Sequence, residues 1–416
     1  MRDILPEQSA AWRWMESQLS SVCARFGYAE IRTPILEQSE LFARSIGTET
    51  DIVAKEMYSF SDRDGSQLTL RPEGTASAVR AYIENHVERS EPVSRWYYMG
   101  PMFRHERPQK GRYRQFHQVG AELLGAEGPA ADVELIDLMV ELAASLGLSG
   151  CSLELNSLGC PACRPAYRES LVAYLRTRED SLCEDCQRRL ATNPLRVLDC
   201  KQEGCARVAD GAPHTLDGLC AACRDHFDAV RAGLEALSIA HRVNHRMVRG
   251  LDYYTRTTFE LLSGELGAQN AVAAGGRYDG LVEALGGPEV PAVGFAAGLD
   301  RIMLMLSGSR LPAGPDLVFV ATRGQAAWEA SLGMVQGLRR RGLCVTSDVR
   351  LGSLKSQMKR ADKAGARFVL LIGDEELEAG TVTVKDMTAA TDSAAKQRSV
   401  PLDELAELLA GEVRSR

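Results

Sequence analysis

Basic residues crowd one short segment, "FRHERPQKGRYRQFHQVGAE", at residues 103–122. Five Arg or Lys side chains fall within the eleven positions from Arg104 to Arg114, around a proline and a glycine. If the second half of this segment is a β-strand, alternate side chains share one face. That face would carry Arg112, Arg114, Phe116, Gln118, Gly120 and Glu122.

These residue types suit a nucleotide beside an amino acid. A guanidinium binds phosphate through two parallel hydrogen bonds, and a phenyl ring offers a plane on which a base can stack. Glu122 could accept hydrogen bonds from an ammonium group. The alternative is a charged, solvent-exposed hairpin, which charge density alone favours. The hairpin by itself leaves both interpretations open.

Cysteines form a second group with chemical potential. Nine of the eleven lie between Cys151 and Cys223, and six of these form the C-x-x-C pairs "CPAC", "CEDC" and "CAAC". Such spacing fits zinc–thiolate sites. Two four-cysteine sites, one site with spare cysteines, and reduced thiols that pack a small domain all remain open. The candidate ligands are Cys160, Cys163, Cys183, Cys186, Cys200, Cys205, Cys220 and Cys223.

The elements around these groups follow from periodicity and turn residues. Upstream of the cysteines we expect an amphipathic helix over 7–27, a β-hairpin within 55–75 around "DRDG", a helix over 75–87, and strands over 96–104 and 112–123. Downstream we expect a strand over 249–264, a strand with a glycine turn over 269–287, and a strand with a helix over 291–306. After the Pro/Gly segment 308–315, alternating strands and helices predict a small α/β domain.

Composition limits the class of protein. With 416 residues, 45% of them hydrophobic and 25% charged, the chain is typical of a globular protein with two to three domains. No apolar run approaches the roughly 18 residues of a membrane span, and the first residues lack a signal-peptide core, so we expect a cytoplasmic location. The net charge of −7 means that nucleic acid would have to be bound by local basic patches.

Three motifs, in the same order, resemble those of the class II aminoacyl-tRNA synthetases. Residues 27–42, "GYAEIRTPILEQSELF", resemble motif 1, whose proline, here Pro34, lies at a dimer interface in that family. The basic hairpin resembles motif 2. Residues 294–306, "GFAAGLDRIMLML", resemble motif 3, with Arg301 on its helix.

Further segments resemble the histidyl-tRNA synthetase family. They are "RPEGT" at 71–75, "QVGAE" at 118–122, "RGLDYYTRTTFE" at 249–260, "AGGRYDGL" at 274–281 and "LKSQMKRADKAGARFVLLIGDEEL" at 354–377. The resemblance spans nearly the whole chain. It implies a ligase that activates L-histidine with ATP, forming histidyl-adenylate and pyrophosphate, and then transfers histidine to the 3′ end of its tRNA.

The resemblance also implies an architecture and partners. The fold class would be α+β, with an antiparallel catalytic sheet and helices over 1–158 and 242–309. A cysteine-rich insertion domain would occupy 159–241, and an α/β anticodon-binding domain would occupy 315–416. The enzyme would be a homodimer and would use magnesium with ATP, and the cysteines would hold structural zinc if they bind metal at all.

Site residues carry over from the matching motifs. The resemblance implies catalytic roles for Arg104, Arg249 and Arg301, and it places Arg107 and Gln109 near the end of the tRNA. ATP would be bound by Arg104, Glu106, Arg112, Phe116 and Arg301. Histidine would be bound by Glu73, Gly74, Thr75, Arg104, Gln118, Glu122, Arg249, Tyr253, Tyr254 and Tyr278.

Two other functions are weighed against this one. Synthetase-like proteins without ligase activity serve as regulatory subunits in histidine biosynthesis, but they typically lack the anticodon domain and parts of the motifs. A general RNA-binding protein with a zinc module would explain the cysteines and the basic helices of the C-terminal domain, but not the hairpin. The intact arginines and the roughly one hundred residues after the core favour the ligase.

Overall fold

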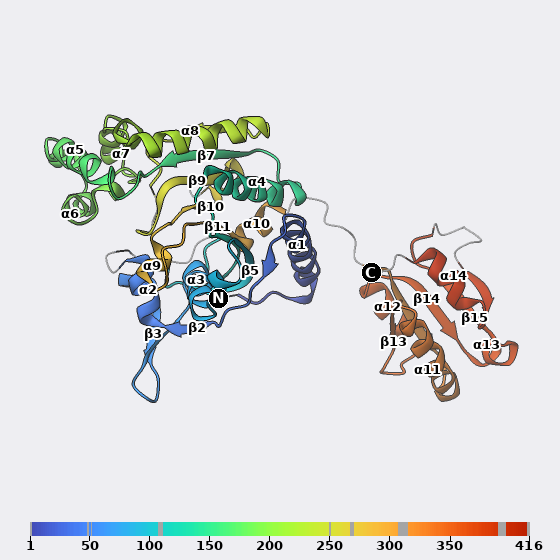
Figure 1. Ribbon diagram of the computed structural model, residues 1–416. Helices are drawn as coiled ribbons and strands as arrows, with labels where there is room; N and C mark the ends of the chain where they lie inside the picture. The colour runs from blue at the N-terminus through green and yellow to red at the C-terminus, as the bar shows by residue number, and fades with distance from the viewer. Residues whose placement is uncertain are drawn as a thin grey trace. The chain divides into compact units, whose positions relative to one another are not determined.

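The computed structural model forms two compact units, residues 1–311 and 312–416 (Figure 1). The structure describes residues 2–47, 50, 52–106, 111–248, 251–266, 270–306, 315–389 and 397–413. Most of the expected Pro/Gly linker, residues 307–314, lies outside these ranges. Each unit has its own hydrophobic core.

An eight-stranded sheet organises the first unit, in the order β1-β5-β6-β11-β10-β9-β7-β8. Neighbouring strands are antiparallel except at the two edges, where β1 pairs with β5 and β7 pairs with β8 in parallel. The expected mixed α+β class is therefore confirmed, with parallel pairs added at the edges. The strands are β1 (Ala29–Glu30), β5 (Ser94–Phe103), β6 (Gln115–Leu124), β7 (Cys151–Ser157), β8 (His241–Val243), β9 (Thr255–Ser263), β10 (Ala271–Arg277) and β11 (Ala292–Gly298).

One face of this sheet is buried under helices. Strand β6 directs Val119, Ala121 and Leu123 into the main core, where they meet apolar residues that recur at helical spacing on α1, such as Met15 and Leu19. The alternate residues of β6 therefore point to the opposite face. The helices of this part are α1 (Pro6–Arg25), α4 (Pro129–Ser145), α9 (Leu281–Ala284) and α10 (Leu299–Leu306).

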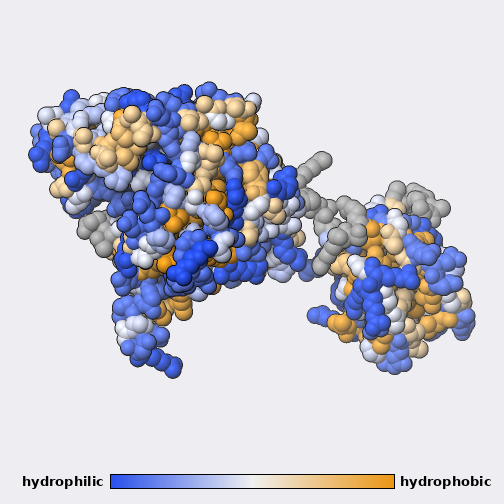
Figure 2. Space-filling view, in the orientation of Figure 1, coloured by the Kyte–Doolittle hydropathy of each residue, from blue (hydrophilic) through white to orange (hydrophobic). Residues whose placement is uncertain are grey.

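A second, three-stranded sheet in the order β2-β4-β3 lies beside α2 and α3. Its hairpin turns at the "DRDG" segment, as expected, and the projecting tip is hydrophilic (Figures 1 and 2). These elements are β2 (Leu36–Gln38), α2 (Ser39–Ile46), β3 (Tyr58–Ser61), β4 (Gln67–Leu70) and α3 (Thr75–Glu84), with a π-helical turn at Ile52–Glu56.

The cysteine-rich segment is a set of short helices inserted between β7 and β8 (Figure 1). The last helix, α8, packs along α4, and its Phe227, Val230 and Leu234 belong to the main core. Part of the segment assigned to an insertion domain therefore contributes to the catalytic core. The helices are α5 (Arg164–Arg176), α6 (Glu184–Thr192), α7 (Glu203–Asp210) and α8 (Ala221–Ala236), with a 3₁₀ turn at Pro194–Val197.

The second unit is an α/β domain with a five-stranded sheet in the order β13-β12-β14-β15-β16. Strands β13, β12 and β14 are parallel, as strand–helix alternation predicts, whereas β15 and β16 are antiparallel. The strands are β12 (Leu317–Thr322), β13 (Cys344–Ser347), β14 (Ala366–Ile372), β15 (Thr381–Asp386) and β16 (Gln397–Pro401). The helices are α11 (Gln325–Arg340), α12 (Leu354–Lys363), α13 (Asp374–Ala379) and α14 (Leu405–Glu412).

Candidate active site

A cavity of about 320 Å³ opens on the face of the large sheet that the helices leave uncovered. Strands β6, β10 and β11 form its floor, because their alternate residues point away from the main core. The sequence-predicted residues that line it are Glu73, Thr75, Arg104, Glu106, Arg112, Phe116, Gln118, Tyr253, Tyr254 and Arg301. Residues separated by more than two hundred positions therefore meet in one site.

Not every predicted residue lines the cavity. Glu122, Gly74 and Tyr278 lie behind its wall, where Glu122 and Tyr278 are almost completely buried. Three further candidates, Arg107, Gln109 and Arg249, lie outside the residues that the structure describes.

One end of the cavity gathers guanidinium groups. Arg104 donates from Nε to the Pro72 carbonyl (2.9 Å), and its guanidinium lies 5.5 Å from the centre of the Phe116 ring. Arg301 donates to the Ala271 carbonyl at 2.7 Å. Burial lowers the pKa of the Arg301 guanidinium, and the nearby positive charge of Arg112 lowers it further. Glu106 lies 3.0 Å from Arg112 and offsets part of this positive charge. The guanidinium groups of Arg104, Arg112 and Arg301 suit this end of the cavity to an anionic ligand.

The hairpin differs from the expectation in one respect. Strand β6 begins at Gln115, so Arg112 and Arg114 precede it instead of sharing its face. Arg112 reaches the cavity because the chain turns at Gly111, which adopts φ +77°. A Cβ at this position would lie 3.1 Å from the Leu304 side chain, which also favours glycine. Arg114 does not line the cavity, and its carbonyl accepts the backbone N–H of Arg104 at 2.9 Å.

A buried carboxyl group lies behind the other end. Glu122 accepts hydrogen bonds from Thr75 Oγ1 (2.8 Å), from the Tyr98 hydroxyl (3.0 Å) and from the Tyr278 hydroxyl. Burial raises the pKa of Glu122 to about 8, and the hydrogen bonds from Tyr278 and Thr75 oppose that rise. Thr75 thus connects the cavity surface to this carboxyl group.

Glu73 is the second carboxylate at this end, and it also fixes a helix. It accepts hydrogen bonds from the backbone N–H groups of Thr75 (2.6 Å) and Ala76 (2.8 Å), which begin helix α3. These N–H groups would otherwise lack partners at a helix N-terminus. Burial raises the pKa of Glu73, although both hydrogen bonds lower it.

Sequence reasoning missed Tyr98, which supports the buried carboxyl group. A side-chain Cβ at either Gly74 or Gly120 would collide with the Tyr98 ring, at 2.2 Å and 2.3 Å respectively. Gly74 therefore makes room for Tyr98 and does not contact the cavity. The signal lay in the strand pairing, because Tyr98 stands directly opposite Gly120 across the β5–β6 hairpin.

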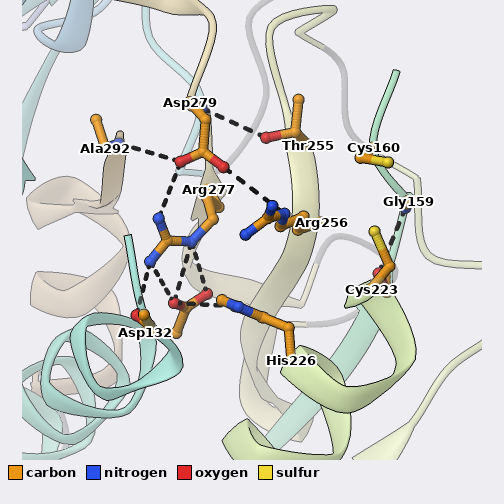
Figure 3. Close-up of polar contacts among 12 residues, drawn as sticks. Asp132, Gly159, Cys160, Cys223, His226, Thr255, Arg256, Arg277, Asp279 and Ala292 are labelled. Atoms are coloured by element: carbon orange, nitrogen blue, oxygen red, sulfur yellow. Dashed lines mark hydrogen bonds and ion pairs between the residues drawn. The ribbon is translucent and has the colours of Figure 1, made fainter. Parts of the chain in front are cut away.

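A buried ionic network lies under β10, and it too escaped the sequence analysis (Figure 3). The Arg277 guanidinium is fully buried and contacts Asp132 (2.7 Å) and Asp279 (2.9 Å). His226 approaches Asp132 from helix α8 at 3.3 Å. Burial raises the pKa of Asp132, but its contacts with His226 and Arg277 outweigh burial and lower it. Arg277 therefore anchors the strand end that carries Tyr278.

Two residues of the cysteine-rich segment also line the cavity, Arg196 and Asp199. No motif pointed to them. The eight candidate metal ligands lie outside the cavity and form two groups of four, and in each group all four Sγ atoms lie within 4.8 Å of one another. Either group could hold a metal ion.

The family model described as "Histidyl-tRNA synthetase" matches residues 1–302, and the model described as "Anticodon binding domain" matches residues 317–412. A histidine–tRNA ligase of Geobacter sulfurreducens is 54% identical over 385 residues, which is 92% of this chain and 93% of that protein. One of Geobacter metallireducens is 52% identical over 412 residues, 99% of this chain and 98% of that protein.

A solved structure gives the same result. The crystal structure of apo S. aureus histidyl-tRNA synthetase superposes with a TM-score of 0.81 at 37% identity, covering 98% of this chain and 97% of that one. A protein of Bacillus halodurans C described as an ATP phosphoribosyltransferase regulatory subunit/histidyl-tRNA synthetase shares the fold, with a TM-score of 0.66 at 22% identity. The chain belongs to the histidyl-tRNA synthetase family.

Proposed function

We infer that the protein is a histidine–tRNA ligase. It joins the carboxylate of L-histidine to the α-phosphate of ATP, releases pyrophosphate, and transfers histidine to the 3′ end of its tRNA. The observation that carries this conclusion is a single cavity with guanidinium groups at one end and a carboxyl cluster at the other. Such a site can hold a triphosphate and an amino acid with their reacting atoms together.

The guanidinium end accounts for ATP. Arg104 would bridge the α-phosphate and the histidine carboxylate, and its contacts with the Phe116 ring and the Pro72 carbonyl support this role. Arg112 and Arg301 would bind the outer phosphates, and Phe116 would stack on adenine, whose edge Glu106 would face. Two anions must approach each other and pyrophosphate must leave, so these positive charges stabilise the transition state. Magnesium would enter with ATP, bound mostly by the phosphates.

The carboxyl end accounts for histidine. Thr75, Glu73 and Gln118 line this part of the cavity and would hold the amino group, with Glu122 acting behind Thr75. Tyr253 and Tyr254 would face the imidazole, because a pocket with polar partners rejects apolar analogues strongly. In this proposal Gly74 and Tyr278 support the pocket and do not contact the substrate.

Other roles rest on the family resemblance. Arg249 would stabilise charge at the α-phosphate, and Arg107 with Gln109 would lie near the 3′ end of tRNA. We propose a homodimer in the cytoplasm, and motif 1 supports the dimer because Ile35 and Leu36, next to Pro34, are 41% and 46% exposed. Exposed apolar side chains that form a contiguous patch are characteristic of an interface. Among the described helices, none is long and apolar enough to cross a membrane.

The second unit would bind the anticodon arm. Helix α12 exposes Lys355, Lys359 and Lys363 at every fourth position, so their ammonium groups form one stripe. Arg360 on the same helix is bound to Asp348 at 2.5 Å and is less available. A row of ammonium groups can neutralise successive phosphates of an RNA strand.

Exchange of labelled pyrophosphate into ATP tests the first half-reaction. The purified protein is assayed with each of the twenty amino acids, and exchange is expected with histidine alone. Charging of tRNA with labelled histidine then tests the second half-reaction. A folded protein that binds histidine but supports no exchange would favour the regulatory-subunit function instead.

A further inference from the structure

The cysteine-rich segment is tied together at two places by its thiol groups. At its root, the first group consists of Cys160 and Cys163, just after β7, and of Cys220 and Cys223 at the start of α8. In its outer part, the second group consists of Cys183, Cys186, Cys200 and Cys205. We name these the root cluster and the outer cluster.

The sulfur positions suit a tetrahedral ion. In the root cluster, Cys160 Sγ lies 3.7 Å from Cys163 Sγ and 3.9 Å from Cys220 Sγ, and Cys163 Sγ lies 3.9 Å from Cys223 Sγ. In a tetrahedral zinc site with Zn–S bonds of about 2.3 Å, the sulfurs are about 3.8 Å apart. A disulfide requires about 2.05 Å, so these separations fit shared coordination.

Spacing and surroundings favour a closed structural site. Three of the four pairs are C-x-x-C and the pair Cys200/Cys205 has four intervening residues, which is the range found in structural zinc sites. In each cluster a backbone N–H points at a sulfur, from Cys160 to Cys163 Sγ and from Cys183 to Cys205 Sγ, both at 3.2 Å. Such donors orient thiolate ligands and stabilise their charge.

A cross-link would stabilise this segment. Between the root pairs lie only short helices and 3₁₀ turns, without a strand among the described residues 164–219. In a chain piece of this size a single hydrophobic core rarely supplies more than about 3–5 kcal/mol, and small domains are commonly reinforced by a metal or disulfides. An ion at the root cluster would close a loop of sixty residues, from Cys160 to Cys220, and would remove much of the conformational entropy of the unfolded segment.

We propose that both clusters are four-thiolate zinc sites, and that they hold two walls of the substrate cavity in position. The root cluster reaches the first wall through Arg164, which follows Cys163 and donates to the Tyr254 carbonyl at 2.5 Å. The neighbouring Gly159 carbonyl accepts the Arg256 backbone N–H at 2.9 Å. Tyr254 lines the cavity, so the root cluster fixes the segment proposed to face the imidazole.

Helix α8 offers a second connection from the root cluster (Figure 3). Cys223 and His226 lie one turn apart on this helix, and His226 contacts Asp132, which binds the buried Arg277. Arg277 precedes Tyr278, the hydroxyl donor to Glu122. An ion that fixes the start of α8 therefore supports the carboxyl end of the cavity as well.

The outer cluster holds the other wall. Asp199 immediately precedes Cys200, and both Asp199 and Arg196 line the cavity. Asn193, at the end of α6, donates to Asp252 at 3.1 Å, next to Tyr253. The part of the chain around the outer cluster thus contacts the segment that carries Tyr253 and Tyr254, which is proposed to bind histidine. This positioning role rests on the proposed function, whereas the presence of zinc does not.

Metal content of the full-length protein, purified under reducing conditions with zinc supplied, decides the first part of the proposal. We expect about two zinc ions per chain by plasma mass spectrometry, and about two released when a mercurial reagent blocks the thiols. Cobalt in place of zinc should give the absorption of a tetrahedral thiolate complex. Absence of metal would overturn the proposal, and so would iron in place of zinc. These readouts need no enzymatic activity and no mutant that folds.

Paired variants separate the sites. Cys163→Ser and Cys186→Ser should each reduce the zinc content to about one per chain, whereas Cys344→Ser, in the second unit, should leave it at two. In pyrophosphate exchange, both cluster variants should raise KM for histidine by about two- to thirtyfold, and the control should not. Zinc-depleted, folded variants with unchanged KM would overturn the positioning role. Failure of the wild-type chain to catalyse exchange would count against the proposed function and leave the metal count standing.

Discussion

At the scale of single residues, the site depends on a carboxyl group that water does not reach. Glu122 is fully buried, and three hydroxyl groups surround it. Isolated burial of a carboxylate is costly, so the group keeps its proton to about pH 8. The surroundings of this carboxyl group therefore depend on the packing of Tyr98, whose ring fits against Gly74 and Gly120.

The proton on Glu122 predicts a pH-dependent stability. The folded chain keeps it to about pH 8, whereas the unfolded chain loses it near the ordinary pKa of 4.5. Its stabilising effect is complete below pH 4.5 and is lost as the pH rises to about 8. Relative to Glu122→Gln, the wild type should therefore lose free energy of unfolding across this range in urea titrations. A constant difference between wild type and Glu122→Gln across this range would contradict the prediction.

The cavity lining predicts that substitutions of Arg112 and Arg114 have different effects on ATP binding. Arg112 lines the cavity and Arg114 does not. Loss of a charge-assisted hydrogen bond costs about 1.5–3 kcal/mol, so Arg112→Ala should raise KM for ATP roughly ten- to hundredfold while KM for histidine changes little. Arg114→Ala is the matched control and should stay within about twofold of the wild type. Equal effects of the two variants in pyrophosphate exchange would refute the assignment of Arg112.

Among the elements, β6 and α12 each bury one face in a core and leave the other face available for ligands. Strand β6 buries Val119, Ala121 and Leu123 in the core, so its opposite face is available for Phe116 and Gln118. Helix α12 is divided in the same way: Gln357 and Ala361 are buried, and the lysine stripe is exposed. Periodicity alone produces both divisions.

The stripe on α12 predicts a separation of the two half-reactions. Replacing Lys355, Lys359 and Lys363 together with Ala should weaken tRNA binding and reduce its dependence on salt, because fewer phosphates are neutralised. Pyrophosphate exchange, which needs no tRNA, should stay at the wild-type rate. Lys385→Ala, on strand β15 of the same unit, serves as the control. Unchanged affinity for tRNA in a filter-binding assay would exclude the stripe from the anticodon interface.

In the molecule as a whole, the first of the two units leaves several apolar side chains exposed. Ile35 and Leu36 on the motif 1 segment are 41% and 46% exposed, and Phe60 on β3 is 45% exposed. A stable interface needs an apolar core of this kind with a polar rim. Ile35 immediately precedes β2 and Leu36 is its first residue, and β2 is an edge strand of the small sheet.

The proposed dimer predicts the outcome of a single charge substitution. Ile35→Asp should shift the mass measured by light scattering from dimer toward monomer at low micromolar concentration, because an unpaired charge would be buried in the interface. Leu332→Asp is the control, since Leu332 is 48% exposed in the second unit. A wild-type protein that is monomeric, or an Ile35→Asp variant that stays fully dimeric, would contradict the use of this surface.

The amino-acid pattern along the chain was enough to locate the elements and to assign the family. Period-2 and helical patterns located the hairpins, the core helices and the α/β domain, since side-chain direction repeats along a strand or helix. Motif order identified the ligase family, and cysteine spacing raised the possibility of metal sites. The predicted start of one strand was wrong: β6 begins at Gln115 and not at Arg112, because the chain is still leaving the turn at Gly111.

The three-dimensional fold was needed to show which side chains meet. It brought Arg301 beside Arg112, placed Glu122 and Tyr278 behind the cavity instead of in it, and revealed Arg277 as a buried anchor. It also sorted eight cysteines into two groups, which spacing alone had left open. Such contacts join residues far apart in the chain, and local periodicity carries no information about them. Long-range packing therefore had to supply what the sequence pattern could not.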